Sequence, residues 1–329
     1  MKVVVTGASG HLGGNLVRLL LEKKRDVKVV IRDDTRAIEG LDVDPVRADV
    51  LDEDSLVKAF SGAGVVYHLA AVITIAAWDG EKVEAVNVAG VRNVVSACLK
   101  TGVKKLVHFS SIHAHHQFPR DQPLDEKREY ADVNPRALPY DQTKARGERE
   151  VLAGVQKGLD AVIVNPTGVL GPHDFKPSRM GEALLGLYRR RLPALVEGAF
   201  DWVDARDVCM GAIEAETRGR PGEKYLLSGA YLPFRELAKL VEDVTGVRAP
   251  RFTTPQWLAR VGAPFVSGWS RVVGKRPLYT SDSLEILRTC NPRISHAKAS
   301  NELGYDPRPL RQTIEDTFRW FEWAGLLKK

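Results

Sequence analysis

Cysteine is scarce in this sequence, which has only three among its 329 residues. Cys98, Cys209 and Cys290 are far apart and lack the CxxC spacing of a zinc or redox site. Their odd number also gives no disulfide framework of the kind that holds small secreted domains together. We therefore expect the protein to work in a reducing compartment.

Long apolar runs are missing as well, and none approaches the length that spans a bilayer. A predicted strand begins at Lys2 and continues through Val3, Val4 and Val5 into Thr6, which leaves no room for an amino-terminal signal peptide. Together these features predict a cytoplasmic protein with no membrane partner.

A strong charge of one sign is also absent, because 48 basic residues stand against 42 acidic ones and the formal net charge is +6. The sequence has no sustained basic stripe with interleaved aromatic residues, so we do not expect nucleic acid as a partner. The small surplus gives a mild attraction for anions, which a phosphate-rich cofactor satisfies. With 44% hydrophobic residues, the chain has the composition of a globular protein with an extensive core.

What the sequence does have, up to about residue 166, is an alternation of short β-rich apolar runs with segments of helical periodicity. Such alternation predicts a Rossmann-type doubly wound parallel sheet of the α/β class, with helices on both faces. The predicted strands are Val3–Thr6, Lys28–Arg32, Val65–Ala70, Leu106–Ser110 and Ala161–Pro166. The predicted helices are Leu12–Lys24, Glu84–Thr101 and Asp141–Lys157.

Glycines recur at every third position where the first predicted strand meets the first predicted helix. Gly7 would allow a tight turn, Gly10 would let backbone approach a pyrophosphate, and Gly13 would let the helix lie close to the sheet. The residues between them, Ser9, His11 and Leu12, belong to the same predicted cofactor loop. A plain glycine-rich turn is the alternative, but the strand and helix on either side favour dinucleotide binding.

The end of the second predicted strand carries Arg32 where enzymes that use NAD usually have an acid. A guanidinium suits the 2′-phosphate of NADP, and Arg36 could assist it. We therefore expect NADP as the preferred cofactor, with NAD possible. Asp33 could serve the ribose instead if the strand ends one residue later, and Arg32 would then be an ordinary solvated charge.

Tyr140 and Lys144 are four residues apart, which places a phenol and an ammonium on one face of a helix. They follow the predicted strand that ends in Ser110 and Ser111. When hydride moves to or from a carbonyl carbon, a proton must move at the substrate oxygen. We expect the ammonium to lower the pKa of Tyr140 from its ordinary value of about 10 toward the working range.

These motifs together give the chain a resemblance, over nearly its whole length, to the extended short-chain dehydrogenase/reductase superfamily. Within it the chain looks most like the dihydroflavonol reductase group and the hopanoid-associated sugar epimerase-like proteins. The resemblance rests on Thr6–Gly13, Asp49, Val50, His68–Ala71, Asn87, Ser110, Ser111, Tyr140, Lys144, Asn165, Pro166, Gly171–Asp174, Asp201–Val208 and Ser295–Lys298.

The resemblance implies roles for individual residues. Ser111 would hold the same substrate oxygen as Tyr140, because the relatives use the second serine of the pair, and Lys144 would hydrogen-bond the nicotinamide ribose. Asp49 and Val50 would hold the adenine, although Asp49 could be a simple loop acid. The remaining implied cofactor residues are Leu69, Ala70, Ala71, Asn87, Ser110, Asn165 and Thr167, together with Tyr140 and Lys144. The alanines could instead end a buried strand, and Asn87 could cap a helix.

Three histidines, His113, His115 and His116, follow Ser111 where the relatives generally carry small residues. Imidazoles at this spacing could bind a metal, but no thiolate or clear acidic partner accompanies them, so no metal is predicted. We expect them to line the mouth of a substrate pocket. A polar loop is the plain alternative, and a part in proton transfer stays open.

The pattern becomes irregular after Pro166, which indicates a second, smaller unit. We predict a dinucleotide-binding domain over residues 1–166, with 201–228 returning to it, and a discontinuous substrate-binding domain over 167–200 and 229–329. The expected elements in this part are helices Glu182–Arg190, Asp204–Thr217, Phe234–Thr245 and Leu310–Trp323 and a strand Tyr225–Ser228.

The leading functional hypothesis is an NAD(P)-dependent reductase or dehydrogenase that acts on a small-molecule carbonyl or alcohol. A nucleotide-sugar epimerase or dehydratase with tightly held NAD is the second, and a dinucleotide-sensing regulator without chemistry is the third. The intact Ser111, Tyr140 and Lys144 argue against the regulator. The substrate is not indicated, since specificity in the family lies in the stretch 167–199 and the C-terminal helices. The resemblance also implies a homodimer.

Overall fold

The computed structural model describes residues 1–73, 80–135, 137–255 and 281–328. Its centre is a seven-stranded, all-parallel sheet with the order β10-β6-β5-β4-β1-β2-β3. The strands are β1 (Val3–Thr6), β2 (Val27–Ile31), β3 (Asp44–Arg47), β4 (Val65–His68), β5 (Lys105–Phe109), β6 (Ala161–Pro166) and β10 (Lys224–Leu227). The order reverses between β1 and β4, which confirms the predicted doubly wound fold and marks the place where such sheets bind ligands.

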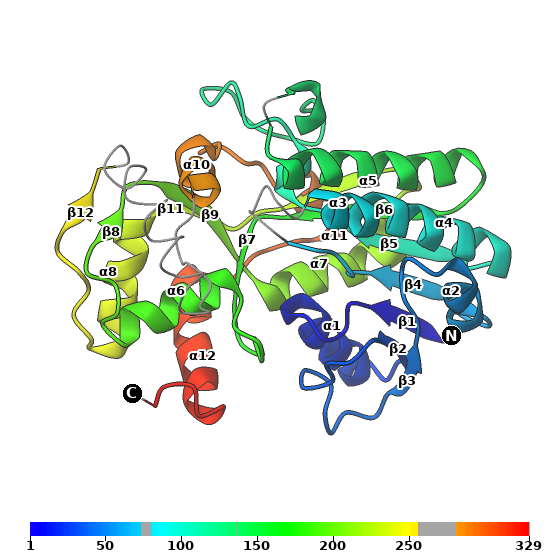
Figure 1. Ribbon diagram of the computed structural model, residues 1–329, viewed down its shortest axis with the longest axis horizontal. Coiled ribbons are helices and arrows are strands. Elements are labelled where there is room, and N and C mark those ends of the chain that lie inside the picture. The colour runs from blue at the N-terminus through cyan, green and yellow to red at the C-terminus, as the bar shows by residue number, and fades with distance from the viewer. Residues whose placement is uncertain (74–79, 136, 256–280, 329) are drawn as a thin grey trace.

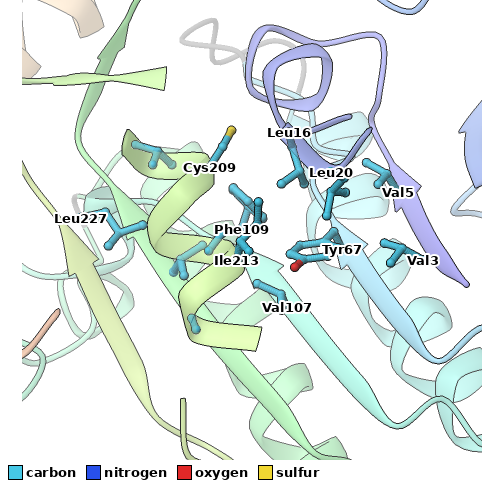
Figure 2. Packing of buried hydrophobic residues seen from close by; sticks show 14 of the residues in the cluster. Val3, Val5, Leu16, Leu20, Tyr67, Val107, Phe109, Cys209, Ile213 and Leu227 are labelled. Atoms are coloured by element: carbon cyan, nitrogen blue, oxygen red, sulfur yellow. The ribbon is translucent and has the colours of Figure 1, made fainter. Parts of the chain in front are cut away.

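Helices cover both faces of this sheet (Figure 1). On one face, α1 (His11–Glu22) and α7 (Ala205–Arg218) pack side by side over a core that includes Leu16, Tyr67 and Ile213 (Figure 2). On the other face lie α2 (Glu53–Phe60), α4 (Gly90–Thr101) and α5 (Pro139–Gln156), packed over alternate residues of the same strands. Because both faces are covered, the central strands β1, β4, β5 and β6 are buried along their whole length and mostly apolar.

The second part of the molecule lies at the left of Figure 1, beside the carboxyl ends of the sheet strands. It has a three-stranded sheet of order β11-β9-β7 and a short pair formed by β12 and β8. Its strands are β7 (Gly168–Leu170), β8 (Leu195–Val196), β9 (Ala199–Asp204), β11 (Ala230–Pro233) and β12 (Thr253–Thr254). Its helices are α6 (Arg179–Tyr188), α8 (Phe234–Thr245), α10 (Ser281–Thr289) and α12 (Leu310–Trp323). A separate cluster of buried residues, including Trp202, Leu237 and Phe321, joins them.

Several predicted boundaries moved by one or two residues. Strand β2 ends at Ile31 rather than at the predicted Arg32, and strand β4 ends at His68 rather than at the predicted Ala70. The helix predicted over Glu84–Thr101 is divided into α3 (Gly80–Glu84), a π-helical turn at Ala85–Ala89, and α4. The edge strand β3 was not predicted because three of its four residues are exposed and it contains a proline. The strand predicted at residues 225–228 is present as β10.

A segment before α12 returns to the central sheet. A short helix, α11 (Ala297–Leu303), contacts both α7 and β10, so residues near the C-terminus contribute to the first core cluster. Among the described residues, no helix has the length and apolar character that crossing a membrane requires.

Candidate active site

The glycine loop joins β1 to α1 at the point where the strand order reverses. Gly7 has φ +73°, and a Cβ there would lie 2.6 Å from the backbone nitrogen of Ala70. A Cβ on Gly13 would lie 2.1 Å from the carbonyl oxygen of Gly7. Both contacts are with backbone, which cannot move aside as a flexible side chain can. Only glycine therefore allows β1, the end of β4 and the start of α1 to approach this closely.

The amino-terminal end of α1 is open to an anion. Its N-cap, Gly10, offers no side chain, and no acidic residue stands in the first turn of this fully described helix. The first amides of a helix have no carbonyl partner within it, and its dipole favours negative charge there. A Cβ on Gly10 would meet only one atom within 4 Å, the Gly7 carbonyl oxygen at 3.4 Å, so space remains beside it. These features fit the pyrophosphate of a dinucleotide.

One carbonyl from the second part of the molecule is tied to α1. His11 Nε2 lies 3.0 Å from the oxygen of Pro172, and Asn15 Nδ2 donates to the same oxygen over 2.9 Å. The sequence predicted His11 as part of the loop, but it gave no sign of Asn15, whose partner is 157 positions away. The segment after β7 is thus held against the cofactor loop.

The segment after β4 is held from two sides. Thr6 Oγ1 lies 2.7 Å from His68 Nδ1 and accepts from the backbone of Ala70 over 3.3 Å. Farther along, Asn87 bonds both backbone groups of Val72, at 2.9 Å and 3.0 Å. The half-buried residues Leu69, Ala70 and Ala71 lie between these anchors. Asn87 therefore shapes the backbone of this segment and does not cap a helix.

The far end of the predicted cofactor site carries Arg32 directly after β2. Its guanidinium is exposed and lies 4.0 Å from the carboxylate of Asp49. The residue after Asp49, Val50, is buried. The other oxygen of Asp49 accepts from the backbone of Leu51 over 2.9 Å. The Arg36 guanidinium instead forms two hydrogen bonds with Asp34, which also accepts from the Arg36 backbone, and these bonds lower the pKa of that carboxyl to about 2. Arg36 is therefore already paired, whereas the salt-bridge partner of Arg32 in the described chain is 4.0 Å away.

The structure brings Ser111, Tyr140 and Lys144 together at the carboxyl end of β5. The hydroxyl of Ser111 lies near enough to the side chain of Tyr140 to affect its ionisation, and it accepts from the backbone of His113 over 3.2 Å. Lys144, one turn farther along α5, is buried and donates to the carbonyl of Phe109 over 3.2 Å. The buried hydroxyl of Ser110 has no hydrogen-bond partner in the described chain. Of the two serines, Ser111 is the one beside the tyrosine.

The pKa of Tyr140 differs from the value expected from the sequence. Burial raises the pKa of Tyr140, and the nearby Ser111 hydroxyl opposes that effect. The predicted lowering by Lys144 is therefore wrong, because desolvation of the phenol dominates. Burial also lowers the pKa of Lys144 to about 8, against the attraction of Glu148.

Glu148 is a residue of the site that the sequence analysis missed. Its side chain is fully buried and accepts from Asn165 Nδ2 over 2.5 Å, while the same amide donates to the Ser111 carbonyl over 3.0 Å. Asn165 thus braces the backbone of Ser111. The spacing gave a signal, since Tyr140, Lys144 and Glu148 follow one another at intervals of four on one helix face.

Thr167 begins the passage from β6 to β7 and donates to Asp201 Oδ1 over 2.6 Å. The backbone of Gly229 donates to the same oxygen over 2.8 Å. Despite these bonds, burial raises the pKa of Asp201 to about 6. The hydroxyl of Thr167 is thereby used inside the protein, where it links β9 to the end of β6.

Asp201→Asn should make the unfolding free energy less dependent on pH. A carboxyl whose folded-state pKa is raised from 3.8 to about 6 contributes stability below about pH 4, which is lost as the pH rises through 6. Between pH 4 and pH 7, the unfolding free energy of the variant should therefore rise relative to that of the wild type, by up to about 3 kcal/mol. Urea unfolding of both proteins at the two pH values measures the difference, and a constant difference would contradict the prediction.

The three histidines after Ser111 do not converge. His113 lies beside Asp141, His115 Nδ1 lies 3.1 Å from the carbonyl of Arg128, and His116 Nδ1 lies 3.1 Å from that of Phe118. Among the residues that the structure covers, no group of three or more His, Cys, Asp or Glu side chains could hold a metal ion. All three histidines line a cavity of about 120 Å³.

A larger hollow of about 500 Å³ lies elsewhere, lined by residues that include Leu21, Lys24, Val27 and Asp44. Val27 and Asp44 begin their strands, so this hollow is at the opposite edge of the sheet from the glycine loop. Its size does not make it the active site, because the paired Ser111 and Tyr140 are not there.

Comparison with known proteins agrees with this geometry. Residues 3–228 match the model of the NAD dependent epimerase/dehydratase family. The chain is 34% identical over 99% of its length to all of sterol demethylase protein B from Methylococcus capsulatus. It is 32% identical to a putative dihydroflavonol 4-reductase from Synechocystis, over 98% of this chain and 95% of that one.

The solved structures include the dTDP-glucose 4,6-dehydratase DesIV from Streptomyces venezuelae, with NAD and TYD bound. It matches with a TM-score of 0.79 and 22% identity over 100% of both chains, which shows the shared fold. With the glycine loop, the reversal of strand order and the family match in agreement, the chain belongs to the NAD dependent epimerase/dehydratase family, among the extended short-chain dehydrogenases.

Proposed function

We propose that this protein is an NADP(H)-dependent reductase that converts a small-molecule ketone or aldehyde into an alcohol. The observation that carries the proposal is the placement of the Ser111 and Tyr140 side chains beside each other, with Lys144 one turn away. A proton donor, a second hydroxyl and a cation thus meet at the sheet edge that also holds the glycine loop. The name of the reductase relative from Synechocystis supports the same class of reaction.

The proposed step follows from these side chains. Tyr140 gives its proton to the carbonyl oxygen of the substrate, and the Ser111 hydroxyl holds that oxygen as negative charge develops on it. A reduced nicotinamide dinucleotide, when bound, supplies the hydride to the carbonyl carbon. Lys144 stabilises the phenolate left on Tyr140 until solvent returns the proton.

The direction of the Tyr140 pKa supports reduction. Burial raises that pKa, so the phenol is protonated before the reaction and can act as an acid. Oxidation of an alcohol would need the phenolate as a base. The residues that would hold the dinucleotide are those of the glycine loop, the segment Leu69–Ala71 after β4, and Arg32 with Asp49 at the adenosine end.

Arg32→Ala should weaken NADPH far more than NADH, because a bidentate guanidinium contact to the 2′-phosphate is lost. We expect NADPH to bind at least tenfold more weakly, a loss of about 1.4 kcal/mol, and NADH less than threefold more weakly. Calorimetric titration of each variant with both dinucleotides measures this. Arg36→Ala is the matched control, since Arg36 is already paired with Asp34.

Asp33→Ala separates NADP preference from the alternative. If NADH binds more tightly than NADPH to the wild type and Asp33→Ala weakens NADH, the ribose role belongs to Asp33. Equal losses of both dinucleotides in Arg32→Ala would contradict NADP preference as well. NAD that copurifies and resists removal would favour the nucleotide-sugar epimerase, in which hydride returns to the same molecule.

A further inference from the structure

Glu148 places a carboxyl group where water does not reach it. Its side chain is fully buried on α5, one turn beyond Lys144 on the same face of the helix. Its Oε1 accepts from Asn165 Nδ2 over 2.5 Å. Its Oε2 has no hydrogen-bond partner within the described chain and lies 3.9 Å from Lys224 Nζ of β10. A buried carboxylate costs free energy unless cations or donors compensate it, and Glu148 has both kinds of neighbour.

The other titratable groups on α5 near Lys144 do not supply a negative charge to it. Tyr140 precedes Lys144 by one turn, and burial raises the pKa of that phenol, so it is uncharged before the reaction. Asp141 lies three residues before Lys144, but its carboxylate is beside His113, 3.2 Å from Nδ1. In the described chain, Glu148 is the acid whose charge acts on the Lys144 ammonium.

The sheet presents two imidazoles to Lys144. His68 of β4 and His108 of β5 stack with 5.3 Å between their ring centroids, and the charge of Lys144 acts on both. Burial lowers the pKa of His68 to about 3 and lowers that of His108 as well. Both rings are therefore neutral near pH 8 and leave the ammonium to Glu148.

Other segments place Tyr130, His115 and Lys224 beside Glu148. Burial raises the pKa of Tyr130 and lowers that of His115, so neither group is charged near pH 8. Lys224 Nζ lies 4.3 Å from the centroid of the Tyr130 ring, and burial lowers the pKa of this lysine too. Loss of the Glu148 charge would therefore destabilise two buried ammoniums, one of them in the site.

We infer that Glu148 is a positioning residue for the proposed reductase, and that its charge keeps Lys144 an ammonium beside Tyr140. Through Asn165 the same carboxylate also fixes the backbone that carries Ser111, since Asn165 Nδ2 donates to the Ser111 carbonyl over 3.0 Å. The inference rests on the proposed function, in which the ammonium stabilises the phenolate and a neutral amine could not. One buried carboxylate thus supports both partners of the proton donor.

Glu148→Gln keeps an oxygen for Asn165 but removes the charge, so activity should be lost at a lower pH than in the wild type. The turnover number with saturating NADPH and benzil, a reactive diketone, is measured from pH 6 to pH 10. In the wild type it should fall above about pH 8, because burial lowers the pKa of Lys144 to about 8. In Glu148→Gln the fall should lie at least about one pH unit lower, a tenfold loss of turnover above it.

Glu150→Gln is the matched control, because Glu150 is two residues along the same helix and bonds Arg92 of α4. Its pH profile should match that of the wild type. Asn165→Ala removes the brace and keeps the Glu148 charge, so it should lower turnover at every pH and leave the fall near pH 8. An unmoved fall in Glu148→Gln, with NADPH binding intact, would overturn the inference.

Glu148→Asp keeps the charge but draws it back by one methylene, so the fall should shift in the same direction by a smaller amount. If Glu148→Gln does not fold, the Asp variant decides, and a profile identical to that of the wild type overturns the inference.

A measurement without substrate separates this inference from the reductase proposal. A lysine whose folded-state pKa is lowered destabilises the fold below that pKa, and the loss is relieved as the pH rises through it. From pH 6 to pH 8, the unfolding free energy of Glu148→Gln should therefore rise more than that of the wild type, and less so when Lys144→Met is added. Equal rises in both proteins would overturn the link between Glu148 and Lys144. A wild type that binds NADPH but does not reduce benzil would overturn the reductase proposal, whatever the unfolding shows.

Discussion

Tyr140→Phe is expected to lower the turnover number by at least a hundredfold and to leave NADPH binding within about twofold of the wild type. The substitution removes one hydroxyl, the proposed proton donor, and keeps the ring that packs beside His113. A positioned general acid contributes roughly two to four decades of rate. Steady-state reduction of a ketone and calorimetric titration with NADPH measure the two quantities separately.

The control for that variant is Tyr225→Phe. Tyr225 lies on the edge strand β10, and its hydroxyl donates to Glu302 of α11 over 3.0 Å. Its turnover number should match the wild type. If Tyr140→Phe keeps more than a tenth of the rate, Tyr140 is not the acid, and the cluster with Ser111 and Lys144 would need another explanation.

Gly13→Ala should have the largest effect on stability of the glycine variants. The added methyl would lie 2.1 Å from the Gly7 carbonyl oxygen and 2.7 Å from the Ala8 Cα, so α1 must move away from the sheet. Overpacking of this kind typically costs about 1–3 kcal/mol, and movement of α1 should also abolish dinucleotide binding. Urea unfolding and calorimetry together follow both losses.

Gly10→Ala separates binding from folding. Its methyl would meet only the Gly7 carbonyl oxygen at 3.4 Å, an ordinary contact, yet it would occupy the space where a pyrophosphate approaches. We expect near-wild-type stability with NADPH weakened at least tenfold. Gly158→Ala, whose added methyl meets no atom of the described residues within 4 Å, should leave NADPH binding unchanged. NADPH binding that survives both Gly10→Ala and Gly13→Ala would contradict the loop as the phosphate site.

Local patterns predicted the parts of the fold that depend on neighbouring residues. The valines of β1 and β4 and the glycine spacing before α1 are features of short segments, and each lies where expected. The polar edge strand β3 was missed because its composition does not favour a strand. Its extended backbone is held by pairing with β2, which a local pattern does not show. The same limit applied to α2, an eight-residue helix that Asp52 caps.

The site residues, too, were predictable where they lie close together in the sequence. Tyr140 and Lys144 could be found because they share one helix, whereas the bond from Asn165 to Glu148 joins a strand to a helix 17 residues away. The pKa of Tyr140 was predicted in the wrong direction because burial depends on the whole fold. The homodimer and the domain boundaries stay predictions.

The shared carbonyl of Pro172 has a consequence for ligand binding. Two side chains at the start of α1 hold one oxygen from the second part of the molecule, so that part cannot shift away without breaking both bonds. Any ligand that moves the segment after β7 therefore also acts on the helix end that faces the pyrophosphate. By thermodynamic linkage, such a substrate and the dinucleotide alter each other's affinity by the same factor.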